Sequence, residues 1–252
     1  FFHNFTLLHD DIMDNAPLRR GNPTVHEKWN SNVAILSGDT MMIQSYQLMA
    51  KVDSNSLKDV IDVFSKAALE VCEGQQLDMD FETQDKVELV DYMKMIEYKT
   101  AVLLAASLKI GAIISGGNKE QQNHLYQFGL NMGIAFQLKD DLLDAFGNHK
   151  DFGKQVGGDI LSNKKTFLYL KALQLADDST KMKLQDYYTT SNNSERKVNV
   201  VKDIFKNLNI QKHTIDMMKA YYTKAMKHLD AIDSDNKAPL ILFSEKLMER
   251  IS

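Results

Sequence analysis

Apolar residues recur along most of the chain at the three- and four-residue spacing of one face of an α-helix. In the stretch 118–147, the positions that follow this spacing are Leu125, Phe128, Met132, Ala135 and Phe136. A stripe of this kind is typical of an amphipathic helix packed on a core. Similar patterns elsewhere predict helices at 1–15, 25–51, 55–81, 86–115, 118–147, 162–177, 180–189, 194–207, 210–233 and 237–251.

Residues that begin or break helices agree with this prediction. Asn118 followed by Gln121 has the form of a capping box, and so does Asp85 followed by Glu88. Proline occurs only at positions 17, 23 and 239, so the long middle of the chain contains no residue that forces a helix break. Because long helices with short connections pack well as one bundle, we predict an all-α fold of about ten helices in a single domain, 1–252.

Composition limits the functions open to this bundle. The 252 residues carry a net charge of −4, so a general surface for nucleic acid is not expected. Cys72 is the only cysteine, which suits a reducing cytoplasm, and no apolar run is long enough to cross a membrane. Since Phe1 stands in the middle of a helical pattern, we also expect that helices preceding it are missing from this sequence.

A cluster of acids ends the first predicted helix. Asp10, Asp11 and Asp14 have the spacing D-D-x-x-D. At about 100° per residue, Asp11 and Asp14 lie about 100° and 40° from Asp10, so the three carboxylates share one sector of the helix. His3 lies about 20° from Asp10 on the same wheel. A single helical histidine is more often structural than functional, and both interpretations stay open for His3.

The same acidic spacing recurs at Asp140, Asp141 and Asp144, with Gln137 in the same sector. One isolated copy is usually a solvated face. Two copies, each following an apolar helical run, indicate instead that six carboxylates face one cleft, where they cannot all stay ionised without cations. A set of oxygen ligands suits Mg²⁺ or Mn²⁺, and Mg²⁺ commonly completes its shell with substrate phosphates. The two clusters therefore predict a metal–phosphate site.

Basic residues that could bind the phosphate lie close to both clusters. Arg19 and Arg20 follow the first cluster, and arginine presents a planar fork to phosphate oxygens. Lys99 and Thr100 lie within an apolar helical stretch, where a lysine can instead extend its charge to solvent. Lys154 and Lys164 lie in a glycine-containing segment that could close over a polyphosphate, although a plain solvated loop is the alternative.

Together these motifs resemble the trans-isoprenyl diphosphate synthases. The matching elements are the two D-D-x-x-D motifs, R-R-G at 19–21, K-T at 99–100, F-Q-x-x-D-D at 136–141 and G-K-x-x-G-x-D-x-x-x-x-K-x-T at 153–166. The resemblance implies the isoprenoid synthase fold, a helical bundle around a central cavity, usually in a homodimer. It also implies condensation of isopentenyl diphosphate with an allylic diphosphate.

The resemblance assigns roles to individual residues. Asp10, Asp11, Asp14, Asp140, Asp141 and Asp144 would bind three Mg²⁺ ions. Arg19, Lys99, Thr100, Gln137, Lys154 and Lys164 would hold the allylic diphosphate, and His3 and Arg20 would bind isopentenyl diphosphate. Gln75 matches a family glutamine near the metal. The family's G-K-x-x-R segment, which precedes the first motif, has no counterpart here.

Product length in this family depends on bulky residues just before the first motif. Phe5, with Thr6 beside it, resembles geranylgeranyl synthases more than farnesyl synthases, so we expect a twenty-carbon product first and a fifteen-carbon product second. A packed core phenylalanine is the alternative for Phe5. Rival functions are a terpene cyclase, against which the second aspartate motif argues, a non-catalytic partner subunit, and a magnesium- or phosphate-binding module without turnover.

Overall fold

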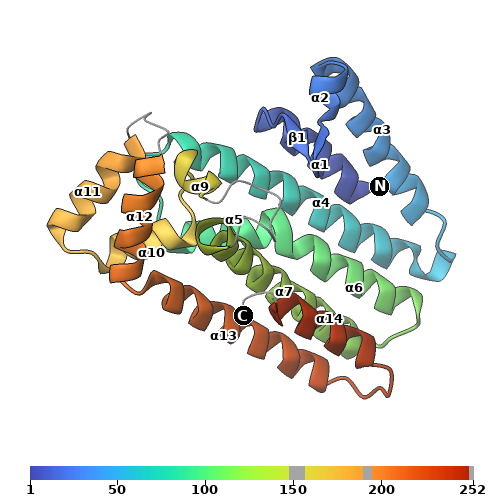
Figure 1. The fold of residues 1–252 in the computed structure, drawn as a ribbon. Helices are drawn as coiled ribbons and strands as arrows, with labels where there is room; N and C mark the ends of the chain where they lie inside the picture. The colour runs from blue at the N-terminus through green and yellow to red at the C-terminus, as the bar shows by residue number, and fades with distance from the viewer. Residues whose placement is uncertain (148–156, 190–194, 250–252) are drawn as a thin grey trace.

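The computed structural model describes residues 1–147, 157–189 and 195–249, and it confirms the all-α fold (Figure 1). Its helices are α1 (Phe2–Met13), α2 (Val25–Lys28), α3 (Ser31–Met49), α4 (Ser54–Thr83), α5 (Leu89–Ile96), α6 (Val102–Ile114), α7 (Lys119–Phe146), α9 (Gly158–Leu161), α10 (Phe167–Leu175), α11 (Asp178–Thr189), α12 (Glu195–Asn207), α13 (Ile210–Asp230) and α14 (Ala238–Glu249). A π-helix, η1, covers Glu97–Ala101, and β1 (Leu18–Arg19) pairs with β2 (Asn22–Pro23) in a short hairpin.

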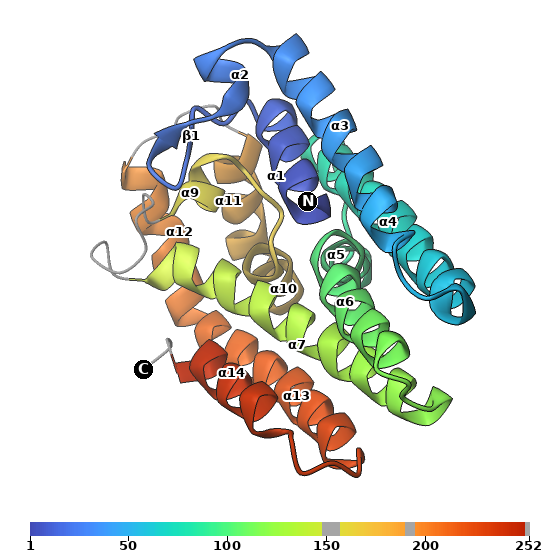
Figure 2. The ribbon, with the colours of Figure 1, turned by 90° about the vertical axis from the view of Figure 1, so that its right-hand side faces the viewer.

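Helix α7 lies at the centre of the bundle, between α6 and α13 (Figure 2). Phe128 and Met132 are buried against Ala225 and Leu229 of α13, and each such large side chain contributes roughly 1.5–3 kcal/mol when buried. The predicted face is wrong at one position, since Phe136 is 43% exposed. With the remaining stripe packed on the core, Asp140 and Asp141 of α7 line a cavity together with residues of α1 and α4.

The predicted capping boxes had different outcomes. The Asn118–Gln121 box is confirmed, because each side chain accepts a hydrogen bond from the other residue's backbone N–H. The Asp85–Glu88 box is wrong: α5 begins after Glu88, whose partner is Asp91, three residues further on.

The predicted helix 86–115 is wrong as one continuous α-helix, because the π-helix η1 separates α5 from α6. Two glycines let neighbouring helices approach this segment closely. A methyl group on Gly74 of α4 would lie 2.2 Å from the backbone nitrogen of Lys99, and one on Gly133 of α7 would lie 2.5 Å from Cα of Ala101. The segment that carries Lys99 and Thr100 is thus held between two helix backbones. π-Helical turns occur frequently at functional sites.

Two other predicted helices differ in their extent. The prediction 25–51 is interrupted at Trp29, after which Asn30 caps α3 by accepting a hydrogen bond from the backbone of Val33 at 2.9 Å. The prediction 162–177 starts too early. Asn163 has a left-handed backbone (φ +58°), and α10 begins only at Phe167.

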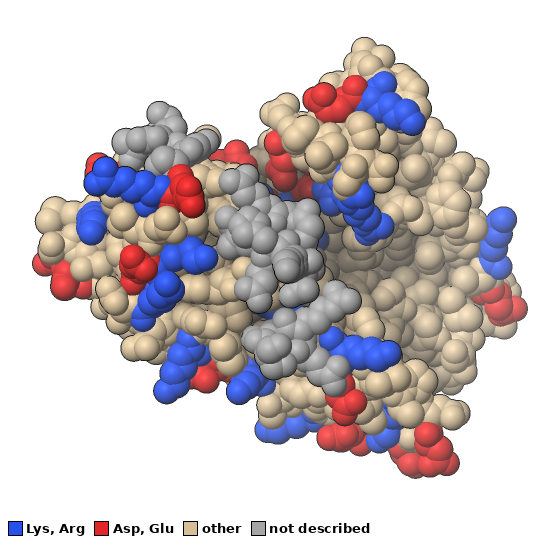
Figure 3. All heavy atoms as spheres, in the orientation of Figure 1, with Lys and Arg blue, Asp and Glu red and all other residues tan. Residues whose placement is uncertain are grey.

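The molecular surface mixes both signs of charge. On the face drawn in Figure 3, Lys and Arg side chains alternate with Asp and Glu, and the surface is hollowed beside them. Among the helices of the described residues, none combines the length and the apolar run that a membrane crossing requires.

Candidate active site

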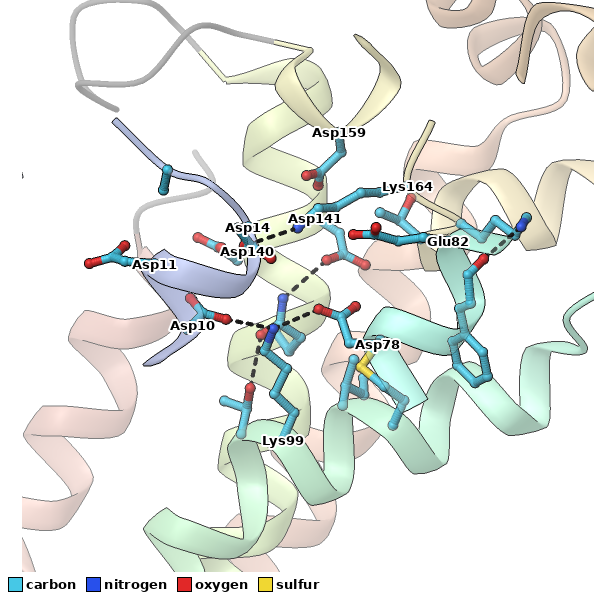
Figure 4. Close-up of a pocket in the computed structure, with 18 of the residues that line it drawn as sticks. Asp10, Asp11, Asp14, Asp78, Glu82, Lys99, Asp140, Asp141, Asp159 and Lys164 are labelled. Carbon is cyan, nitrogen blue, oxygen red and sulfur yellow. Dashed lines mark hydrogen bonds and ion pairs between the residues drawn. The ribbon is translucent and has the colours of Figure 1, made fainter. Parts of the chain in front are cut away.

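A cavity of about 1140 Å³ lies between α1, the β1–β2 hairpin, α4, α5, η1, α7 and the segment 159–166 (Figure 4). The carboxylates that line it are Asp10, Asp11, Asp14, Asp78, Glu82, Asp140, Asp141 and Asp159. The cations that line it are Arg19, Arg20, Lys99, Lys164 and Lys165. Eight acids therefore face five bases among the described residues, and bound cations would be needed to balance the charge.

The first aspartate motif lies at the end of α1, where the hairpin brings an arginine back over it. Arg20 and Gly21 have φ of +53° and +76°, the left-handed pair of a type I′ turn. The preceding Arg19 donates from Nη2 to Oδ2 of Asp10 at 2.9 Å and from Nε to Oδ1 of Asp11 at 2.7 Å. The predicted proximity of the arginine to the first motif is thus present in the structure.

Lys99 connects the first motif to α4. Its Nζ lies 3.0 Å from Oδ1 of Asp10 and 2.6 Å from Oδ2 of Asp78. Burial lowers the pKa of Lys99, but the carboxylates of Asp78 and Asp10 outweigh burial and raise the pKa above its usual value. The lysine remains charged in the cavity and does not extend to solvent.

Lys164 faces the same motif from the opposite side. Its Nζ lies 3.8 Å from Oδ2 of Asp14. Burial raises the pKa of Asp14, with Lys164 opposing the shift. Since a nearby cation favours the ionised carboxylate, a metal ion beside Asp14 would relieve the cost of its burial.

The second motif divides between two environments. Asp140 and Asp141 line the cavity, as predicted, with Gln137 one turn before them. Asp144 is not among the lining residues. Its Oδ2 accepts a hydrogen bond from the backbone of Asp159 at 3.0 Å, while its backbone oxygen accepts one from Gly157 at 2.7 Å. Asp144 therefore holds the beginning of α9 in place.

Asp141 is buried and accepts three hydrogen bonds. Tyr92 donates its hydroxyl to Oδ2, Phe167 donates its backbone N–H to Oδ2 at 3.3 Å, and Gln137 donates from Nε2 to Oδ1 at 3.2 Å. Burial, together with the nearby charge of Asp159, raises the pKa of Asp141 to about 8 in the absence of bound metal.

A second, smaller cavity of about 250 Å³ shares Asp10, Lys99 and Thr100 with the first. Most of the surface that lines it is apolar. The apolar side chains there are Phe5, Leu7, Met13, Val71, Met79 and Leu103, and Thr6, His9, Cys72, Gln75 and Gln76 lie among them. His3 also lines this apolar cavity, whereas Arg20 lines the main one. Burial and then the guanidinium of Arg20 lower the pKa of His3, so the two residues are electrostatically coupled.

Four residues that line the cavity had no role predicted from the sequence. Asp78 and Glu82 on α4 had no predicted role. The stretch that begins at Asp78 starts like a calcium loop, but Thr83 and Leu89 stand where that loop needs glycine and glutamate. Asp159 stood inside the quoted 153–166 motif without a role, and Tyr92 gave no signal. Of the predicted residues, Lys154 falls outside the described residues.

The donor set fits a hard divalent cation. Carboxylate oxygens approach the cavity from α1 and from α7, and oxygen is what Mg²⁺ prefers. In the described parts of the chain, no three acidic, imidazole or thiol groups already surround one point. Arg19 and Lys99 are paired with acids of the first motif. Magnesium usually takes only one or two carboxylates and keeps water or phosphate for the rest, so a gathered triad is not required.

Comparisons with known proteins place this site in a family. The family model described as polyprenyl synthetase matches residues 1–208. A geranylgeranyl diphosphate synthase of Methanosarcina mazei is 44% identical over 174 residues, which span 68% of this chain and 54% of the relative. A geranylfarnesyl diphosphate synthase of Natronomonas pharaonis is 43% identical over 171 residues, 67% of this chain and 50% of the relative. The matched region thus spans about half the length of both.

A solved structure agrees with these matches. The geranylgeranyl pyrophosphate synthase of Corynebacterium glutamicum, complexed with isoprenyl diphosphate and magnesium, superimposes with a TM-score of 0.89 at 27% identity, covering 99% of this chain and 76% of that one. Motifs, fold and site geometry therefore lead to one conclusion: the chain belongs to the polyprenyl synthetase family.

Proposed function

We propose that this protein elongates prenyl chains, condensing isopentenyl diphosphate with an allylic diphosphate in a magnesium-dependent reaction. One observation carries the proposal. A charged cavity, lined by aspartates of α1 and α7, shares Asp10, Lys99 and Thr100 with an apolar cavity. A substrate with a diphosphate head and a hydrocarbon tail matches that division. The names of the relatives support the same reaction class.

In this proposal Asp10 and Asp11 of α1, Asp14 directly after α1, and Asp140 of α7 hold the metal. Asp141 and Asp144 keep the partners described above. Three Mg²⁺ ions are expected from the family resemblance, with Mn²⁺ as a substitute. When bound, the metal supplies positive charge for the diphosphate oxygens. Arg19 and Lys99, now paired with aspartates, would then be released to bind the same oxygens.

The bond between the allylic C1 and the diphosphate oxygen breaks, and the electron pair leaves with the diphosphate. Lys99, Arg19 and Lys164 stabilise the charge that develops on it. The alkene of isopentenyl diphosphate attacks the allylic cation, a carbon–carbon bond forms, and the released diphosphate takes the proton that is lost. The protein needs no nucleophile for these steps, and the apolar cavity keeps water from the cation.

We further propose geranylgeranyl diphosphate as the main product and farnesyl diphosphate as the second. Phe5 supports a floor in the apolar cavity, since its ring lies on the lining and packs against His9, with ring centroids 4.7 Å apart. One similar protein is a geranylfarnesyl diphosphate synthase. A twenty-five-carbon main product would therefore contradict our assignment of product length.

We also propose that the protein is a homodimer. Helix α3 supports this proposal, because Val33, Leu36 and Ile43 expose 39%, 66% and 61% of their surface on it. A second copy would cover this apolar face. Sedimentation of the chain and of a Leu36→Lys, Ile43→Lys variant tests the proposal: a dimer that becomes a monomer supports it, and a wild-type monomer contradicts it.

Product analysis tests the reaction itself. The full chain is incubated with Mg²⁺, isopentenyl diphosphate and dimethylallyl, geranyl or farnesyl diphosphate, with and without EDTA. We expect prenyl diphosphates that disappear with EDTA and in Asp140→Asn, and that persist in Asp235→Asn, which changes an exposed aspartate outside the cavity. Cyclic hydrocarbons would indicate a terpene cyclase instead. The absence of any product with every starter would refute catalysis.

A further inference from the structure

Tyr92 on α5 is a buried tyrosine whose hydroxyl reaches the second aspartate motif. The residue is 3% exposed and packs in the same core cluster as Met95 and Ile96. Its hydroxyl donates to Oδ2 of Asp141, and both residues line the main cavity. Burying a hydroxyl is favourable only where it finds a partner, so this contact is specific.

Asp141 also accepts a hydrogen bond from Gln137, which lines the main cavity. Its Oδ1 accepts from Nε2 of Gln137 at 3.2 Å, and Oε1 of Gln137 in turn accepts from the hydroxyl of Thr100 at 3.2 Å. Four side chains from α5, α7 and η1 thus form one chain of hydrogen bonds, which ends in the wall of the main cavity.

The chemistry of these groups fixes the orientation of the Gln137 amide. Bound metal in the cavity favours the ionised form of Asp141, and an ionised carboxylate only accepts hydrogen bonds. A hydroxyl that donates to Gln137 must face the amide oxygen. The amide nitrogen is therefore directed to Asp141 with one N–H, and its second N–H remains for an oxygen in the cavity. Reversing the amide would place oxygen against carboxylate and nitrogen against the hydroxyl proton.

We propose that Tyr92 is a positioning residue which, through Asp141, holds Gln137 in the orientation that binds the diphosphate. The inference rests on the proposed function of the cavity. Without the hydroxyl, Oδ2 of Asp141 would keep only the long contact with Phe167. The buried carboxylate would then turn towards other donors and release Gln137, because a buried charged acceptor that loses a partner is costly.

Binding of pyrophosphate with Mg²⁺, measured by calorimetry, tests the role without depending on turnover. Tyr92→Phe removes one oxygen atom and should weaken this binding about tenfold, the usual effect of losing a hydrogen bond to a charged group. Tyr46→Phe is the matched control, since that half-buried hydroxyl on α3 donates to Ser65 at 3.3 Å and does not line the main cavity. It should leave binding unchanged.

A double-mutant cycle separates positioning from a purely structural effect. In a Gln137→Met background, Tyr92→Phe should have no further effect on pyrophosphate binding, because the residue it positions is gone. The same loss in both backgrounds would overturn the proposal. Thr100→Val, at the opposite end of the chain, should weaken binding to a similar degree and serves if Tyr92→Phe does not fold. Wild-type binding in both Tyr92→Phe and Thr100→Val would also overturn the proposal.

The failure of the proposed function gives a different result. If the wild-type chain neither binds pyrophosphate with Mg²⁺ nor forms prenyl products, the cavity is not a diphosphate site and both inferences fall. If the wild type does both and Tyr92→Phe binds equally well, only the role of Tyr92 is lost.

Discussion

Replacing Gly74 by alanine should disturb catalysis from outside the cavity. The added methyl would lie 2.2 Å from the backbone nitrogen of Lys99 and 2.7 Å from its Cα, whereas carbon contacts are comfortable only at about 3.5 Å or more. Helix α4 and η1 must therefore separate by about 1 Å. Overpacking of this kind costs about 1–3 kcal/mol, and the higher helix propensity of alanine returns at most about 1 kcal/mol.

The expected result is a net destabilisation of about 1–2 kcal/mol, or a fall in Tm of about 2–8 °C for a chain of this size. The larger effect is on rate. A displacement of about 1 Å in a group that positions substrate can cost about 100-fold, and Lys99 is such a group here. Thermal unfolding and steady-state prenyl transfer, measured on the same preparation, give both quantities.

Gly111→Ala is the matched control for this experiment. Gly111 lies within α6, and a methyl group there meets nothing within 4 Å. The substitution should raise stability by about 0.5–1 kcal/mol and leave the rate unchanged. If Gly74→Ala behaves like Gly111→Ala in both measurements, the close approach of α4 to the π-helix does not position Lys99.

Further predictions concern acids, pH and product length. Asp140→Asn should lower the rate of prenyl transfer at least about 100-fold. Asp144→Ala should chiefly lower Tm, because Asp144 caps α9. Equal losses of rate in the two variants would contradict these different roles. The pKa of Asp141 is raised to about 8 in the folded protein, so the metal-free fold binds more protons than the unfolded chain between about pH 4 and 8. The Tm of the metal-free protein should therefore fall as pH rises through that window, and the fall should be smaller in Asp141→Asn. Burial and the neighbouring His124 lower the pKa of His228, so the unfolded chain binds a proton at this histidine at a higher pH than the folded protein does. The Tm should therefore fall as pH drops below about 6.5. If the slope of Tm against pH is unchanged in His228→Gln, His228 makes no such contribution. Phe5→Ala should lengthen the product by at least one isoprene unit in chromatography, and unchanged length would refute the floor.

The sequence predicts the helix α7 and the position of Asp140 and Asp141 in a cavity, because the apolar period and the Asn118 cap are local features. It does not predict the π-helix at 97–101. The apolar positions continue at helical spacing on both sides of that segment, and the change of winding coincides with the approach of Gly74 and Gly133 from helices distant in sequence. A helical wheel of this segment alone cannot predict contacts with other helices.

The aspartate motifs show the same limit within the site. On a wheel, Asp144 shares the sector of Asp140, but it stands in the last turn of α7, where the backbone of Asp159 is the nearer partner. Asp78 reaches Lys99 from α4 without any motif of its own, because only the packing of α4 on η1 joins them. Residue types and spacing thus indicate the chemistry, and tertiary contacts decide which carboxylates face the substrate.

The central claim is that aspartates of α1 and α7 bind one diphosphate through divalent cations. A crystal structure of the full chain with Mg²⁺ and a non-reactive allylic thiodiphosphate tests it most directly. We predict the diphosphate in the main cavity, with metal joining it to Asp10, Asp14 and Asp140, its oxygens on Arg19 and Lys99, and the tail beside Phe5. Diphosphate bound elsewhere, with Arg19 and Lys99 still paired to the aspartates, would contradict it.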